Sequence, residues 1–260
     1  MATSNYVIIN SKYRENGSKS TSDFIYSIGE SLEVSTVAVK SISMVNSEYN
    51  VKAGHNVLIA RSGGVDTPLT FPVGQYTVTT LNAQLVLLLD GLLGGTNTAV
   101  KNNLTGKIEI TTTSNVQFST DLKSSPMGQI LGLGDLTGYY PSSPSTTINA
   151  PYLPSLEGSN NYHICSNTLG QGQGSLLVNN SKRAIICTVP ADVDFGGIIH
   201  YEAKDIQLNE RKFNRPINIQ TMHIQVLDDD NEIVDLNGSN IEIVLQVSLE
   251  HIGDTTTFGM

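Results

Sequence analysis

The stretch Ile241-Glu242-Ile243-Val244-Leu245-Gln246-Val247-Ser248-Leu249 decides the fold of this chain. Apolar side chains occupy every second position of this stretch, and the same period of two recurs at Met222, Ile224 and Val226. Because successive side chains of a β-strand point to opposite faces, this alternation gives each strand one apolar face. Two such strands need a shared interior, so the sequence predicts a two-sheet sandwich.

Further strands are predicted along most of the chain. Residues 24–28 and 35–45 read as two separate strands, the second with one slip in its alternation that a β-bulge would explain. The runs 107–110 and 116–118 read as two short strands of a hairpin. We find few helical patterns and no internal repeat, which predicts an all-β chain.

One segment, residues 77–93, breaks the β pattern. Its leucines recur at helical spacing, and either Thr77 or Thr79 could cap the N-terminus while Gly94-Gly95 ends the helix. The leucine positions are Leu81, Leu85, Leu88, Leu89 and Leu92. A stripe of this kind usually packs against a core, so we expect one short helix without a cofactor or partner-helix role.

The segment 124–161 differs in composition, with five prolines among many Ser, Gly and Tyr residues. We expect it to be a long, largely irregular excursion, of the kind that often forms a functional surface. The polar stretch 11–22 is expected to be a loop or arm. The predicted organisation is a single domain over residues 1–260, with a loop-rich insertion at about 66–161 that could form a small subdomain.

Composition narrows the classes of function. The 260 residues are 39% hydrophobic and only 15% charged, against about 25% charged in an average domain, which favours a folded, turn-rich β protein. The formal charge of −9 argues against nucleic acid as the main partner, because phosphate binding needs clustered Lys and Arg. No apolar run reaches about 18 residues, so no membrane-spanning helix is expected.

The sequence offers no catalytic, cofactor or metal motif. Its five histidines are dispersed, and its two cysteines, Cys165 and Cys187, lack both a zinc pattern and a nucleophile signature, so we expect buried free thiols. The acidic run Asp228–Glu232 is expected to be a solvated hairpin turn, with calcium binding as the alternative. We therefore expect no enzyme activity, no cofactor and no metal.

Several segments, taken in order, resemble the penton, or minor capsid, proteins of virophages and nucleocytoplasmic large DNA viruses. The N-terminal part of the resemblance lies in Asn10–Arg14, Ser22–Ile28 and Val37–Asn50. It continues in Phe71–Tyr76 with the leucine helix after it and in Gly132-Leu133-Gly134, and ends in Val234–Gly238 with the terminal alternating strand. The resemblance implies a jelly-roll β-sandwich that assembles as a homopentamer and closes the five-fold vertices of an icosahedral virion.

The resemblance also implies partners and a location. A penton would contact neighbouring copies and the major capsid protein, and would be found in the virion after assembly inside the host cell. The interface residues we expect are Tyr13 and Arg14 in the polar stretch and Tyr139, Tyr140 and Tyr152 in the long loop. The alternative function is a carbohydrate- or receptor-binding β-sandwich in which exposed tyrosines make the contacts, although the absence of Trp disfavours it.

Overall fold

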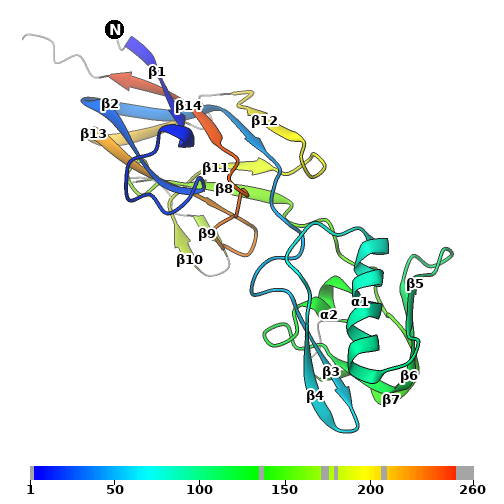
Figure 1. Cartoon of the computed structure of the whole chain (residues 1–260). Helices are drawn as coiled ribbons and strands as arrows, with labels where there is room; N and C mark the ends of the chain where they lie inside the picture. The colour runs from blue at the N-terminus through cyan, green and yellow to red at the C-terminus, as the bar shows by residue number, and fades with distance from the viewer. Residues whose placement is uncertain (1–2, 135–137, 171–175, 179–180, 206–209, 250–260) are drawn as a thin grey trace, which may run out of the picture. The chain divides into compact units, whose positions relative to one another are not determined.

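The structure, a computed structural model, describes residues 3–134, 138–170, 176–178, 181–205 and 210–249. The chain divides into two compact units, which are described separately (Figure 1). The first unit comprises Met1–Glu48 and Ser159–Met260, and the second comprises Tyr49–Gly158. The second unit begins before the insertion boundary of 66 expected from the sequence, and that expected insertion includes residues 135–137, which lie outside the described ones.

The first unit is built on one large antiparallel sheet with the strand order β1-β14-β2-β13-β8-β11, in which β12 also pairs with β2. A separate two-stranded sheet joins β9 and β10. A short 3₁₀ helix, η1 (Ser11–Tyr13), follows the first strand. The strands are β1 (Thr3–Asn10), β2 (Asp23–Val45), β8 (Asn161–Cys165), β9 (Leu176–Val178), β10 (Ser181–Arg183), β11 (Ile185–Pro190), β12 (Ile198–Glu202), β13 (Arg211–Leu227) and β14 (Ile241–Leu249).

Strand β2 holds the two halves of this sheet together. Its first part pairs with β13, its second part pairs with β14, and its last residues pair with β12 on the other side. The expected separate strands 24–28 and 35–45 are therefore one strand of 23 residues. The sequence divides it because β2 and β13 slip in register around residues 28–31, where Gly29 adopts a φ of 84°. A bulge of this kind interrupts the apolar alternation and bends the strand.

The alternation predicted near the C-terminus is confirmed. In β14, Ile241, Ile243, Leu245 and Val247 are all buried, and in β13 Met222, Ile224 and Val226 are buried with them. These side chains form one core with Phe24, Ile42 and Tyr162 from the rest of the first unit. The all-β class and the jelly-roll β-sandwich inferred from the sequence are confirmed.

The second unit combines a five-stranded sheet with a helix. The sheet has the order β4-β3-β6-β5, and β7 pairs with β6. Its elements are β3 (Val57–Ser62), β4 (Val65–Thr70), α1 (Val78–Leu93), β5 (Thr98–Lys101), β6 (Ile108–Ser119), α2 (Met127–Ile130) and β7 (Tyr139–Asn149). Its core is a separate cluster in which Leu81, Leu85 and Leu89 of α1 pack with Phe71 and Phe118.

The helix is where the sequence placed it. Thr77 is the N-cap: its side chain accepts a hydrogen bond from the backbone N–H of Thr80, and the Thr80 side chain accepts one from the N–H of Thr77. This reciprocal pair satisfies two of the N–H groups that a helix start leaves without partners. Gly94, with a φ of 70°, ends the helix as expected. The leucine stripe faces the core, which confirms the structural interpretation of that pattern.

One sequence prediction in the second unit was wrong, and one strand there was missed. Residues 107–118 do not form a hairpin: β6 runs through them as one strand, and register shifts between Thr111 and Phe118 let its polar middle pass along β7. The segment 124–161, expected to be largely irregular, also contains α2 and the 11-residue β7, a strand that the sequence did not predict. Pro141 and Pro144 gave β7 the appearance of a loop, yet proline is tolerated on an edge strand, and β7 pairs only with β6 among the described residues.

Candidate interface surfaces

Tyr13 and Arg14, expected at an interface, lie at the end of η1 in the first unit. The side chain of Tyr13 is 68% exposed and Arg14 is exposed. Arg14 donates a hydrogen bond from Nη1 to the carbonyl of Ser11 at 3.0 Å. Ser11 is itself buried, and its Oγ accepts a hydrogen bond from the backbone N–H of Ile241 at 3.0 Å. The stretch expected to be a loop or arm is thus anchored to β14, and it presents the Tyr13 ring to solvent.

The large sheet of the first unit has an apolar patch on its outer face that we did not predict from the sequence. Tyr6 and Ile8 in β1 are 56% and 58% exposed, and Ile8 lies directly opposite Val244 of β14. We define these three residues as the β1 outer patch. Lys40 of β2 places its Nζ 4.5 Å from the centre of the Tyr6 ring, a cation–π contact. The run Tyr6-Val7-Ile8-Ile9 is the signal that could have revealed it, because apolar residues at consecutive positions face both sides of a strand.

Tyr139 belongs to a compact polar group on the sheet of the second unit. Arg61 and Asp66, which face each other across the β3–β4 hairpin, form a two-point ion pair with N···O distances of 2.6 and 2.9 Å. The Tyr139 hydroxyl donates to Asp66 Oδ2 at 2.6 Å, and the Arg61 guanidinium lies 3.8 Å from the ring centre. The hydrogen bonds from Arg61 and then Tyr139 hold the pKa of Asp66 below its usual value. Tyr139 is thus engaged within its own unit.

The other two tyrosines of the expected interface differ in their surroundings. Tyr140 is half-buried. Its hydroxyl donates to the carbonyl of Asn149 at 2.7 Å, which joins the two ends of β7. Tyr152, by contrast, is 56% exposed and lines a cavity of about 290 Å³ beside the end of α2. Of the three tyrosines, Tyr152 is the one whose ring stands open to a ligand or partner.

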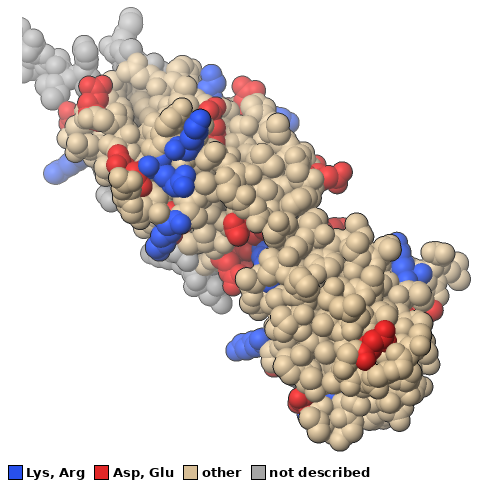
Figure 2. Space-filling view, in the orientation of Figure 1, with Lys and Arg blue, Asp and Glu red and all other residues tan. Residues whose placement is uncertain are grey.

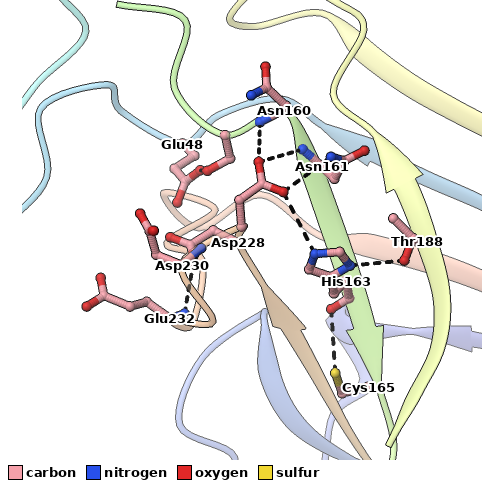
Figure 3. A network of polar contacts seen from close by, with 11 residues as sticks. Glu48, Asn160, Asn161, His163, Cys165, Thr188, Asp228, Asp230 and Glu232 are labelled. Atoms are coloured by element: carbon pink, nitrogen blue, oxygen red, sulfur yellow. Dashed lines mark hydrogen bonds and ion pairs between the residues drawn. The ribbon is translucent and has the colours of Figure 1, made fainter. Parts of the chain in front are cut away.

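The acidic turn after β13 is tied into the first unit by its own carboxylates (Figure 3). Asp228 accepts hydrogen bonds from the backbone N–H groups of Asp230 and Glu232 at 3.0 and 2.8 Å. Asp229 accepts from the backbone N–H of Asn160 at 2.7 Å and lies 3.8 Å from Nε2 of His163. These contacts explain the Asp-rich pattern as a hydrogen-bonded turn, since both carboxylates accept hydrogen bonds from backbone N–H groups.

The described part of the chain contains no group of three or more His, Cys, Asp or Glu side chains that could hold a metal ion. The cysteines are free thiols: Cys165 is buried and Cys187 is half-buried. Burial raises the pKa of the Cys187 thiol to about 11, which keeps it protonated and poorly nucleophilic near neutral pH. None of the described helices is long and apolar enough to cross a membrane.

Charged side chains of both signs lie on the face shown in Figure 2. Several Lys and Arg lie close together near the middle of the first unit, with Asp and Glu around them, and charged residues are sparse over the second unit. Acidic side chains border this group, whereas a nucleic-acid site would need an extended basic stripe.

Comparison with known proteins identifies the fold. No protein-family model matches the sequence, and no curated protein matches it. Among solved structures, the chain is similar to a viral penton protein. That structure is the crystal structure of the selenomethionine-labelled mavirus penton protein. The match covers 95% of this chain and 100% of the mavirus chain, with a TM-score of 0.52 and 14% sequence identity. The resemblance to a penton protein inferred from the sequence is confirmed at the level of the fold.

Proposed function

We propose that this chain is a structural capsid protein, a penton whose homopentamers close the five-fold vertices of an icosahedral virion. The observation that carries the proposal is that the likeness to the mavirus penton protein covers 95% of this chain, and so extends over both units. On this account the second unit is an insertion carried by the jelly-roll unit. The protein is assembled inside the host cell, resides in the virion and contacts the neighbouring major capsid protein, without catalysing a reaction.

A closed ring of identical chains needs two different surfaces on each chain, because each copy meets one neighbour on each side. The first unit offers two candidates. One is the β1 outer patch, and the other surrounds Ile198 of β12, whose side chain is 67% exposed. The β1 outer patch is apolar and Ile198 is an exposed apolar side chain, and exposed apolar groups of this kind commonly mark association sites. We propose that the β1 outer patch of one copy packs on the Ile198 surface of the next.

Two of the tyrosines expected at an interface, Tyr13 and Tyr152, are exposed and can contribute to contacts with other chains. Tyr13 is exposed at the end of η1, directly after β1, so it can add to the contact made by the β1 outer patch. Tyr152 belongs to the second unit, and we expect it to serve a different contact. Arg14, Tyr139 and Tyr140 have hydrogen-bond partners within their own units and need no contact with a second copy.

Native mass spectrometry of the purified full-length chain tests the proposal. We expect a species of five chains, each of 28.0 kDa. An Ile8→Asp variant should shift the distribution to single chains, because it places a charge in the centre of the β1 outer patch. Leu104→Asp is the matched control, since Leu104 is 94% exposed and lies in the second unit; it should leave the five-chain species intact. A wild-type chain that stays single or forms a different closed number would contradict the pentamer.

A further inference from the structure

The second unit contains a cavity at its surface, beside Tyr152. Its volume is about 290 Å³, near the lower end of the range of about 300–1,000 Å³ seen for small-molecule sites. The residues that line it are Gln129, Gly132, Gly134, Tyr152, Leu153 and Ser155.

Backbone contacts hold the two sides of this cavity in place. The N–H of Tyr152 donates to the carbonyl of Gly132 at 3.0 Å, and the N–H of Ser155 donates to the carbonyl of Ile130 at 2.9 Å. The approach is so close that a Cβ on Gly132 would lie 2.5 Å from the carbonyl oxygen of Tyr152. Gly132 also has a φ of 74°, which favours glycine. The loop that carries Tyr152 and Ser155 is thus fixed against the end of α2 before any ligand arrives.

The described lining residues carry no charge. The polar groups at the cavity are the Gln129 amide, the Ser155 hydroxyl and the Tyr152 hydroxyl, and none of the three is hydrogen-bonded to another described residue. An amide and two hydroxyls can both donate and accept hydrogen bonds. The exposed Tyr152 ring adds a flat apolar surface beside them. This combination suits a ligand that presents hydroxyl groups on one side and C–H groups on another.

A cavity in the first unit differs from this one because its lining includes charged residues. It has a volume of about 550 Å³ and is lined in part by Asp192, Glu202 and Lys204, so charged groups surround it. A phosphate, sulfate or carboxylate ligand is recognised by Arg or Lys in most sites. The described lining of the second-unit cavity has neither residue, which disfavours an anionic ligand there and favours a neutral one.

From this geometry we propose that the second unit binds a neutral carbohydrate at the Tyr152 cavity, with the ring packed on a sugar face and the Gln129 amide and Ser155 hydroxyl bonded to sugar hydroxyls. The inference does not depend on the capsid role, because it rests on the lining of one cavity within one unit. A saccharide site on a capsid protein would give the particle a means of attachment to glycans.

The test is an array of glycans probed with the full-length chain, carrying neutral mannose, galactose, glucose and N-acetylglucosamine oligosaccharides beside sialylated and sulfated ones. We expect binding to a neutral glycan, followed by calorimetry with that compound. Tyr152→Ala should weaken its affinity about tenfold, whereas Tyr152→Phe, which keeps the ring, should stay within about threefold. Gln129→Ala and Ser155→Ala should each weaken it by a smaller factor.

Leu87→Ala is the matched control, since it removes a 65% exposed side chain from α1 of the same unit, outside the cavity lining, and should leave glycan affinity unchanged. Equal melting temperatures of the wild type and Tyr152→Ala establish that the variant is folded. Absence of neutral-glycan binding, binding restricted to sialylated or sulfated glycans, or equal affinity in Tyr152→Ala would each overturn the proposal. So would retention of a protein receptor alone, with no glycan on the array bound.

Discussion

The two units differ in net charge and in which segments of the chain form their cores. Residues 49–158 carry 5 Lys or Arg and 6 Asp or Glu, a net charge of −1, whereas the rest of the chain carries 10 and 18, a net charge of −8. The second unit is one continuous segment whose core includes α1. The first is assembled from both ends of the chain, with Thr3 paired to Leu249.

This difference suggests a division of labour. Copies of an acidic first unit repel one another, so they associate best through uncharged surfaces such as the β1 outer patch. The nearly neutral second unit is free of that constraint, and its cavity brings the Tyr152 ring beside uncharged polar groups. The two proposals thus divide between the units, with assembly proposed for the first and ligand binding for the second.

The largest expected effect comes from breaking each core in turn. Phe24 is fully buried in the first unit and Leu85 is fully buried in the second. Phe24→Ala should cost about 3–5 kcal/mol and Leu85→Ala about 2–5 kcal/mol, because each leaves a cavity. Differential scanning calorimetry should show each change lowering the transition of its own unit. If both changes lowered a single common transition equally, the two-core comparison would fail.

The next largest expected effect is the loss of stability of the first unit in acid. Burial alone would raise the pKa of Asp23, but hydrogen bonds from His223, Lys19 and Gln225 outweigh it and hold the pKa below its usual value. The ionised form is therefore the one that stabilises the fold, and this stability is present above the ordinary Asp pKa of about 3.9 and lost as pH falls through the lower, folded-state value.

The Asp23→Asn variant measures this contribution. Its first-unit melting temperature should be lower than that of the wild type at pH 7 and should fall less between pH 5 and pH 2, because the group no longer titrates. Asp66→Asn in the second unit is the control: that carboxyl is also shifted downward but is solvent-exposed, so its effect should be smaller. Parallel curves for wild type and Asp23→Asn would show that Asp23 does not carry the acid response.

The smallest effect concerns helix α1 of the second unit. Thr77→Ala should lower the stability of that unit by about 1 kcal/mol, because it removes the side chain that caps α1. Thr79→Ala is the matched control: it lies inside the helix, where alanine is favoured, and should be neutral or slightly stabilising. Denaturant unfolding followed by circular dichroism would measure both, and equal values for the two variants would remove the capping role of Thr77.

The sequence predicted the elements whose signal is local. Strand β14 and helix α1 follow from alternation and from the leucine spacing with its cap, since each pattern lies within about twenty residues. The continuity of β6 could not be predicted, because its register shifts place polar residues where a turn was expected. Strand β7 contains prolines and looked like a loop, because its own residues do not favour a strand and its pairing with β6 depends on a distant segment.

The surfaces were harder to predict because they depend on distant residues. Tyr139 was expected at an interface, but its hydroxyl binds Asp66, which lies 73 positions away and reaches it only through the fold of the β3–β4 hairpin. The β1 outer patch needs Val244 beside Ile8, a pairing between opposite ends of the chain. Tyr152 is exposed, but the cavity around it depends on the close approach of Gly132, which no sequence pattern indicates.

Cryo-electron microscopy of the purified full-length chain tests the central claim most directly. The account predicts closed rings of five copies, in which the β1 outer patch, centred on Ile8, meets the Ile198 surface of the neighbouring copy. Single chains, rings of another symmetry, or a ring held together through the second unit alone would contradict it.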